Sequence, residues 1–498
     1  MRWVVPLVLA LLAGDAAATT APDALRREIR QAATAAQQGQ LEDAAARLRA
    51  VVSSEEFAAL GAAEQHVALG LLAALALDLD DPLTALEYYA LSSQYAQADD
   101  DDWAGRFSAA YWAENWTDAA RSLVVLAGHW PQRLSQFDER AIMAAFGALD
   151  PATDHAARVE LAGALFDASW VLEDGIEPSH IWRWLAVDLF TRGQQERAQT
   201  VVRRITSPEM LLSLRVDHRY AAIVAAAPEQ FDIDRASAAA RAQTAAIVRA
   251  RPRSLRALTD HTYDLLSTGQ NDVVLELTAD ALARIDAAGP DAPPFDDVAR
   301  YRPWIMNNRA IALSRLGRRD EALVQLEQAR TLDEDGGTNV SQTINLAGEY
   351  LDDGRAREAL ALLGQIDWTR GGMSSYGKMQ MQSVRHGALV ALGEVAEAER
   401  TLQYLRDHQG DDVRAYQRAL VRANDAEAAA ALLVARLENV EQRNDALLDV
   451  QDGLELPKTA VQQEYERRWQ ALLARPDVEA AIAKVGRREK FNIVLGTG

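Results

Sequence analysis

The sequence has 498 residues, of which 49% are hydrophobic, and it carries a formal net charge of −21 with no cysteine. This apolar content is enough to build a packed core and excludes a disordered chain, while the negative charge disfavours nucleic acid and anionic lipid as ligands. The absence of cysteine excludes disulfides, thiolate metal sites, a cysteine nucleophile and the lipid-bearing cysteine of a lipoprotein.

Residues 1–18 have the features of a secretory signal peptide. Arg2 gives the positive start, residues 3–13 form an apolar run, and Ala16–Ala18 supplies the small residues of a cleavage site, predicted after Ala18. The run is shorter than the roughly 20 apolar residues that span a bilayer. We therefore expect an exported, soluble periplasmic protein that is not inserted in the membrane once the signal is cleaved. An ordinary apolar helix is the alternative.

From residue 19 onwards the sequence favours helix almost without interruption. Apolar residues recur at spacings of three and four, and Gly or Asp interrupts them about every 15 residues. An alternation of period two, which would indicate strands, is not found. These patterns predict an all-α fold of antiparallel helix pairs with no sheet, and residues 19–286 are expected to form an N-terminal solenoid with irregular spacing.

Aromatic residues cluster within this first region. Trp103, Phe107 and Tyr111 stand at spacings of four and form one helical stripe, and Trp112 and Trp116 form a second one nearby. Exposed rings of this kind would give a platform for a sugar or a peptide. A helical aromatic stripe is more often packed in the core, and we favour that interpretation.

A segment rich in proline and glycine follows the first solenoid. Residues 287–297 contain Gly289, Pro290, Pro293 and Pro294 and cannot form the interior of a helix. The segment is expected either to separate two domains or to form a long surface loop of a single solenoid. Residues 298–458 would then form a second solenoid.

The second solenoid contains an internal repeat with an offset of 37 residues between 308–329 and 345–366. The nine identical positions pair Asn308 with Asn345, Ala310 with Ala347, Gly317 with Gly354, Arg318 with Arg355, Glu321 with Glu358, Ala322 with Ala359, Leu323 with Leu360, Leu326 with Leu363 and Gln328 with Gln365. A period of this length indicates stacked helical hairpins, each of which needs a neighbour to bury its apolar face.

This unit resembles the tetratricopeptide repeat. The repeat has a small residue where its two helices cross, a turn glycine and a small residue on the second helix, and the matching residues are Ala310, Gly317 and Ala322, then Ala347, Gly354 and Ala359. Small side chains let helix axes approach to about 8 Å, and glycine accepts the positive φ that ends a helix. The resemblance implies an α-α superhelix whose inner wall binds a protein or peptide partner.

Three polar residues of the first helices are candidates for ligand binding. The resemblance implies that Asn308 and Asn345 would grip the backbone of a bound chain, since an amide both donates and accepts hydrogen bonds. Arg315, on the same helix as Asn308, would meet a carboxylate. The alternative is that these residues brace neighbouring repeats. The paired lysines of the family's carboxylate-clamp version are absent.

Residues 459–498 are expected to close the solenoid and then leave it. Residues 459–474 and 477–485 read as amphipathic capping helices, which shield the last repeat. Residues 492–498 are expected to form a mobile tail.

The remaining patterns do not indicate catalysis. The eight histidines include no pair at helical metal-ligand spacing, and Ser375 and Lys378 have the spacing of a serine acyl transferase but lack its partner motifs. We therefore expect no catalytic residue, metal or cofactor. The sequence is interpreted as a non-catalytic periplasmic scaffold of the cell envelope. The alternative is an all-helical periplasmic enzyme or a glycan-binding protein acting on an envelope polymer.

Overall fold

The computed structural model describes residues 20–288, 292–333, 337, 339–368 and 373–495. Within these residues the regular secondary structure is helical, and only two isolated backbone bridges occur. The predicted all-α fold is therefore confirmed. The chain divides into two compact units, residues 1–204 (unit 1) and residues 205–498 (unit 2), which we describe separately.

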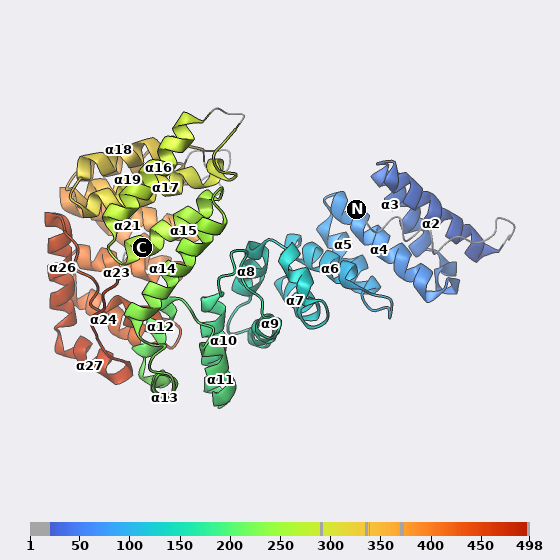
Figure 1. The fold of residues 1–498 in the computed structure, drawn as a ribbon, viewed down its shortest axis with the longest axis horizontal. Coiled ribbons are helices and arrows are strands. Elements are labelled where there is room, and N and C mark those ends of the chain that lie inside the picture. The colour runs from blue at the N-terminus through green and yellow to red at the C-terminus, as the bar shows by residue number, and fades with distance from the viewer. Residues whose placement is uncertain (1–19, 289–291, 334–336, 338, 369–372, 496–498) are drawn as a thin grey trace. The chain divides into compact units, whose positions relative to one another are not determined.

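Unit 1 is built from consecutive helix pairs (Figure 1). Its elements are α2 (Ala21–Gln37), α3 (Leu41–Val52), η1 (Glu55–Ala59), α4 (Ala62–Asp78), α5 (Pro82–Ser92), α6 (Asp100–Trp112), α7 (Trp116–His129), η2 (Pro131–Gln136), α8 (Glu139–Ala148), α9 (His155–Asp167), α10 (Ser179–Thr191) and α11 (Gln195–Val202). The pairs α2/α3, α4/α5, α6/α7 and α10/α11 pack closely as hairpins.

The second helix of each of these hairpins carries a fully buried alanine. These alanines are Ala44, Ala85, Ala119 and Ala198, and none of them is accessible to solvent. Larger side chains there would hold the helices apart. The irregular first solenoid therefore uses the same packing rule as the regular repeats.

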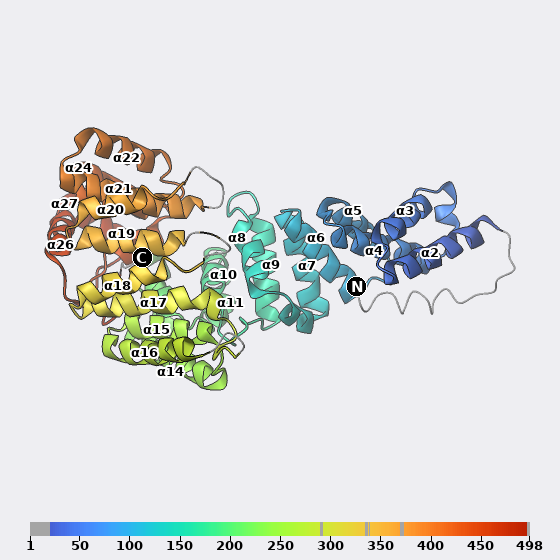
Figure 2. The same cartoon turned by 90° about the horizontal axis from the view of Figure 1, so that it is seen from above.

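Unit 2 continues with hairpins that stack in chain order from α14 to α24 (Figure 2). Its elements are α12 (Pro208–Arg215), η3 (His218–Tyr220), α13 (Ala221–Ala226), α14 (Ile233–Ala250), α15 (Leu255–Ser267), α16 (Asn271–Ala287), α17 (Val298–Arg315), α18 (Arg319–Ala329), α19 (Val340–Asp352), α20 (Ala356–Leu363), α21 (Ser375–Leu392), α22 (Val395–Asp407), α23 (Val413–Arg422), α24 (Ala426–Glu438), α25 (Arg443–Asp449), α26 (Ala460–Leu473) and α27 (Pro476–Val485).

The internal repeat corresponds to α17/α18 and α19/α20. The turn glycines Gly317 and Gly354 have φ values of +77° and +79°, which L-residues rarely adopt. Ala310, Ala347 and the two second-helix alanines are buried in one core that runs from α17 to α21. The resemblance to the tetratricopeptide repeat is confirmed at these positions.

The segment 287–297 does not mark the boundary between the compact units, which lies between Arg204 and Ile205. Its described end packs inside unit 2, where the Asp297 carboxylate accepts hydrogen bonds from the backbone of Leu255 at 2.7 Å and Arg256 at 3.0 Å. Asp297 thus caps the first turn of α15. Which of the two predicted alternatives applies to the segment stays a prediction. Residues 289–291 lie outside the described residues.

The end of the chain agrees with prediction in its helices and differs after them. The capping helices are present as α26 and α27. The expected mobile tail is wrong for residues 492–495, because Ile493 is buried and Val494 donates a backbone hydrogen bond to Ser267 at 2.7 Å. Residues 496–498 lie outside the described residues.

The predicted signal segment, residues 1–18, also lies outside the described residues. In the part of the chain that the structure describes, no helix is both long enough and apolar enough to cross a membrane.

The crossing alanines give a test of the packing. Replacing the fully buried Ala347 by leucine would overfill the contact between hairpins and lower the free energy of unfolding by about 1–3 kcal/mol. Urea unfolding followed by circular dichroism measures this change. Ala361→Leu, at an exposed position of α20, is the matched control and should leave stability nearly unchanged. Equal effects of the two substitutions would contradict the close packing described here.

Candidate functional site

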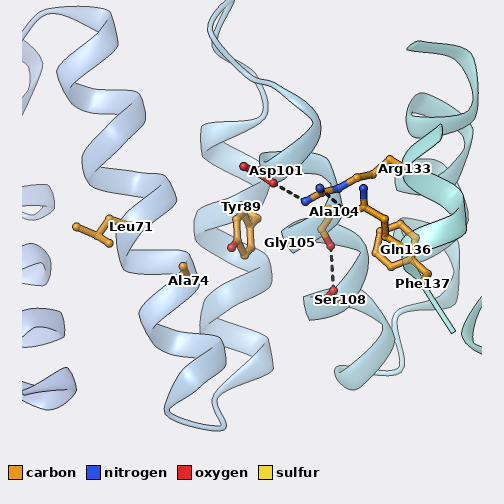
Figure 3. Close-up of a pocket in the computed structure, with 10 residues that line it drawn as sticks. All are labelled: Leu71, Ala74, Tyr89, Asp101, Ala104, Gly105, Ser108, Arg133, Gln136 and Phe137. Atoms are coloured by element: carbon orange, nitrogen blue, oxygen red, sulfur yellow. Dashed lines mark hydrogen bonds and ion pairs between the residues drawn. The ribbon is translucent and has the colours of Figure 1, made fainter. Parts of the chain in front are cut away.

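Unit 1 contains a pocket of about 390 Å³. It lies between α4 and α6, the first helices of two successive hairpins, with α5 and η2 completing its walls (Figure 3). Its lining residues are Leu71, Ala74, Tyr89, Asp101, Ala104, Gly105, Ser108, Arg133, Gln136 and Phe137. Pockets of this size suit a small ligand or a single large side chain.

Tyr89 is the polar group with the most unusual setting in this pocket. Its side chain is 8% exposed, and burial raises the pKa of its phenol well above the usual value. Among the described residues no hydrogen-bond partner of its hydroxyl is found. The hydroxyl oxygen keeps access to solvent at the pocket wall, so it can bond water or a polar group of a ligand that enters the pocket.

Gly105 makes this position of Tyr89 possible. A Cβ atom built on Gly105 would lie 2.2 Å from Cζ of the Tyr89 ring and 2.4 Å from its hydroxyl oxygen. Only glycine therefore lets the ring lie against the middle of α6. A glycine inside a helix lowers helix stability, and here the close approach to Tyr89 gives it a packing role.

Arg133 is held by partners within the chain and does not offer a free charge. Its guanidinium pairs with Asp101, donates to Gln136 Oε1 at 2.7 Å and lies 3.7 Å from Asp100. In Figure 3 the Arg133 side chain reaches across the pocket towards Asp101. Because Arg133 is already engaged by two carboxylates, the pocket offers no free cation to an anionic ligand, and an uncharged group with an apolar body and a polar tip suits it.

The predicted aromatic residues do not form one exposed platform. Phe107 is 2% exposed and packs edge-on against Phe137 with 4.8 Å between ring centroids, so it belongs to the core behind the pocket. Trp112 is 69% exposed. Tyr111 contacts both Trp112 and Trp116 edge-on. The remaining member, Trp103, lies 5.2 Å from the guanidinium of Arg106. The core interpretation thus holds for Phe107, and the exposed ring is that of Trp112.

The three predicted groove residues of unit 2 contact neighbouring helices. Asn308 is 4% exposed, and its amide donates to the Thr259 carbonyl at 3.1 Å and to the Thr262 hydroxyl at 2.9 Å. The Asn345 amide donates to Asn307 at 3.0 Å. These bonds join α15 to α17 and α17 to α19, as the bracing alternative expects. A ligand role for the two asparagines stays a prediction.

Arg315 is the last residue of α17, the helix that also carries Asn308. Its Nη1 donates to the Leu266 carbonyl at 2.8 Å, which satisfies an acceptor at the end of α15. Burial lowers the pKa of this guanidinium, although it remains cationic at any pH of interest. The predicted role of Arg315 in binding a carboxylate remains untested.

A half-buried histidine contacts a buried aspartate and serine in unit 1. Asp102 accepts hydrogen bonds from His66 at 2.7 Å and from the Ser92 hydroxyl at 3.0 Å. A catalytic triad needs histidine between serine and aspartate, so that the imidazole can take the serine proton. Here aspartate lies in the middle. The cluster therefore ties α4, α5 and α6 together and does not activate a nucleophile.

Only one residue of this pocket, Gly105, could have been singled out from the sequence. The pocket is formed by residues from α4 to η2, and their proximity depends on how the hairpins stack. Gly105 within an otherwise helical segment was the available signal, because a glycine inside a helix often marks a close approach. In the described part of the chain, no group of three or more histidine, aspartate and glutamate side chains is placed to hold a metal ion.

The described residues fold into stacked helical hairpins, two of which resemble the tetratricopeptide repeat at their crossing alanines and turn glycines. No protein-family model matches the sequence of this chain, and no curated protein does. Among solved structures, it is similar to the tetratricopeptide domain of P58(IPK), with 13% identity over 83% of this chain and 99% of that one and a TM-score of 0.20. It is also similar to the APC/C hetero-tetramer Cut9–Hcn1, with 14% identity over 97% and 86% of the two chains and a TM-score of 0.31.

A third similar structure is that of Naa15/Naa10 bound to HypK-THB, with 12% identity, coverage of 92% and 84% of the two chains and a TM-score of 0.25. Likenesses with TM-scores this low do not bear on function. The description of the repeats rests on the crossing alanines and turn glycines of the chain itself.

The His66–Asp102 pair predicts a dependence of stability on pH. The hydrogen bond to Asp102 raises the pKa of His66 above its ordinary value of 6.5. The folded state therefore favours protonated His66, and this stabilisation is complete below pH 6.5 and is lost as the pH rises through the raised pKa.

We expect the stability difference between the wild type and His66→Gln to shrink from pH 6 to pH 8.5, as measured by urea unfolding of both proteins. Glutamine is a suitable replacement because it can keep a hydrogen bond to Asp102 without titrating. A difference that is the same at both pH values would show that the charge of His66 contributes nothing.

Proposed function

We propose that this protein is a non-catalytic periplasmic scaffold that binds a segment of a partner protein on unit 1, with one side chain of the partner in the Tyr89 pocket. The observation that carries the proposal is a pocket of about 390 Å³ with apolar and polar groups on its walls, on which the Tyr89 hydroxyl is open to an incoming group. Stacked helical hairpins commonly present such faces to peptides and to partner domains.

The walls of the pocket define the partner side chain. Leu71, Ala74 and Phe137 supply apolar contact, and the Tyr89 hydroxyl supplies a single polar contact. The charged groups at the rim are already paired with one another. A large uncharged side chain with a hydrogen-bonding tip, such as tyrosine or glutamine, fits this chemistry better than a carboxylate or an ammonium group.

Export of the protein is part of the proposal and rests on residues 1–18. The positive start, the short apolar run and the small residues at 16–18 are those of a cleavable secretory signal. A periplasmic location would place the partner in the cell envelope.

Filling the pocket tests the proposed binding mode. A photo-crosslinking residue at Ser108, which lines the pocket, should form a covalent adduct with one envelope protein in living cells. Ala74→Phe places an aromatic ring in the pocket and should reduce that adduct at least tenfold while the melting temperature stays close to the wild-type value.

Ala46 is the matched control, since it is exposed on α3 away from the pocket. A crosslinker at position 46 should form no adduct with that protein, and Ala46→Phe should leave the adduct at position 108 intact. Adducts of equal yield at the two positions, or an adduct that Ala74→Phe does not reduce, would refute the pocket as the binding site.

The proposed export has a separate test. Mass spectrometry of the protein recovered from a periplasmic fraction should show a mature chain that begins at Thr19, because cleavage is predicted after Ala18. Replacing Ala16 and Ala18 by arginine should block cleavage, since the peptidase site requires small residues at these positions. A cytoplasmic protein that retains residues 1–18 would contradict the export proposal.

A further inference from the structure

Residues 486–495, which we call the strap, follow α27 without helical structure and cross unit 2, with a bend at residues 492–493. Five backbone hydrogen bonds hold the strap to three distant segments of the sequence: Arg487 N to Val216 O at 3.0 Å, Val494 N to Ser267 O at 2.7 Å, Phe491 N to Asp452 O at 2.8 Å, Asp452 N to Glu489 O at 3.0 Å, and Leu454 N to Ile493 O at 2.8 Å. Main-chain pairing of this kind is how a protein surface binds an extended peptide as an added strand.

The side chain of Gln451 grips the backbone of the strap. Its amide nitrogen donates to the Arg487 carbonyl at 2.9 Å, and its amide oxygen accepts from the Glu489 backbone N–H at 2.8 Å. An amide that donates to one peptide group and accepts from the next recognises an extended backbone whatever its side chains are. The sequence pattern assigns this task to Asn308 and Asn345, and the structure shows the geometry at Gln451.

Alternate side chains of the strap add a pattern of their own. Phe491 and Ile493 are buried, as expected for residues two apart on one side of an extended chain. The Glu489 carboxylate pairs with Arg215 at 2.6 Å. The guanidinium of Arg215 also lies 5.3 Å from the centre of the Phe491 ring. Every second position of the strap therefore contacts the rest of unit 2 through its side chain: an acid at 489, an aromatic residue at 491 and a branched aliphatic residue at 493.

Two glycines bring the backbones close together. A Cβ atom on Gly486 would lie 2.5 Å from the Val216 carbonyl oxygen, and one on Gly453 would lie 2.9 Å from the Ile493 carbonyl oxygen. Neither clash could be relieved by rotating a side chain, because the other atom belongs to the backbone. At these two positions, glycine allows the main chain of the strap to lie directly against the main chain of its surroundings.

We propose that Arg215, Val216, Ser267 and residues 451–454 form a peptide-binding site in which the strap is the built-in occupant. An extended peptide of a partner protein replaces the strap. That peptide carries the pattern acid–x–aromatic–x–branched aliphatic. Release of the strap leaves backbone acceptors at Val216, Ser267 and Asp452 for the incoming chain. This site is independent of the Tyr89 pocket in unit 1.

The strap competes strongly because it is tethered. A tethered segment acts at an effective concentration of the order of millimolar, so a free peptide of the same sequence binds the wild-type protein weakly. A change in the strap that spares its surroundings should lower this competition and expose the site.

The test uses the full-length protein and a fluorescein-labelled synthetic peptide of residues 486–495, with binding measured by fluorescence anisotropy. Phe491→Ala removes a buried anchor of the strap, and we expect this variant to bind the peptide at least tenfold more tightly than the wild type does. Lys490→Ala, at the neighbouring exposed position, removes only a solvent-exposed ion pair with Glu455. Because such a pair contributes little to stability, this variant is the matched control and should bind the peptide like the wild type. A peptide with alanine in place of its phenylalanine and isoleucine should not bind.

Two further variants keep the proposal falsifiable. Glu489→Gln, which removes the ion pair with Arg215 and disturbs packing less, should also increase peptide binding, and it replaces Phe491→Ala if that variant loses its helical circular dichroism. Gln451→Leu combined with the weakened strap should abolish the gain. Folded variants that bind the peptide no better than the wild type would show that the strap is a fixed part of the fold. A gain that survives Gln451→Leu would place the peptide elsewhere.

Discussion

A helical hairpin cannot bury its apolar face alone, and the architecture of both units follows from that constraint. Each pair must lie close to the next, so the residues where helices cross have to be small. Ala44, Ala85 and Ala119 in unit 1 and Ala322 and Ala359 in unit 2 are all inaccessible to solvent. Where the side chains of successive hairpins do not fill the space between them, a pocket forms, and the Tyr89 pocket between α4 and α6 lies at one such junction.

The parts of the fold that depend on this local rule could be predicted from the sequence. Ala310 and Ala347 and the glycines at 317 and 354 recur because few side chains fit a helix crossing or a turn with positive φ. The strap could not be predicted. Its partners, such as Val216 and Ser267, lie more than 200 residues away, and a backbone hydrogen bond leaves no mark in the side-chain sequence. Asn492 and the residues after it therefore read as a tail.

The candidate sites could be predicted only in part, because the sequence shows which side chains are present but not which neighbours they contact. The sequence identifies Asn308 as a recurrent amide, but it does not tell whether the amide faces a ligand or the Thr262 hydroxyl that it contacts in the structure. Phe107 and Trp112 lie on one helix and are both large aromatics, yet one is buried and the other exposed, since only the neighbouring hairpins decide which face is covered. Tyr89 was missed because its place on the pocket wall becomes visible only once α6 is placed against it.

Hydrogen exchange of unit 1, measured helix by helix in Leu123→Ala, tests most directly whether stability is shared only between neighbouring hairpins. Leu123 is fully buried on α7, and its truncation should cost about 2–5 kcal/mol. If each hairpin depends on its neighbours, α6, α7 and α9, which pack together, should lose protection while α2 and α3 keep theirs. An equal loss of protection in α2 and α3 would show a single globular core and contradict this account.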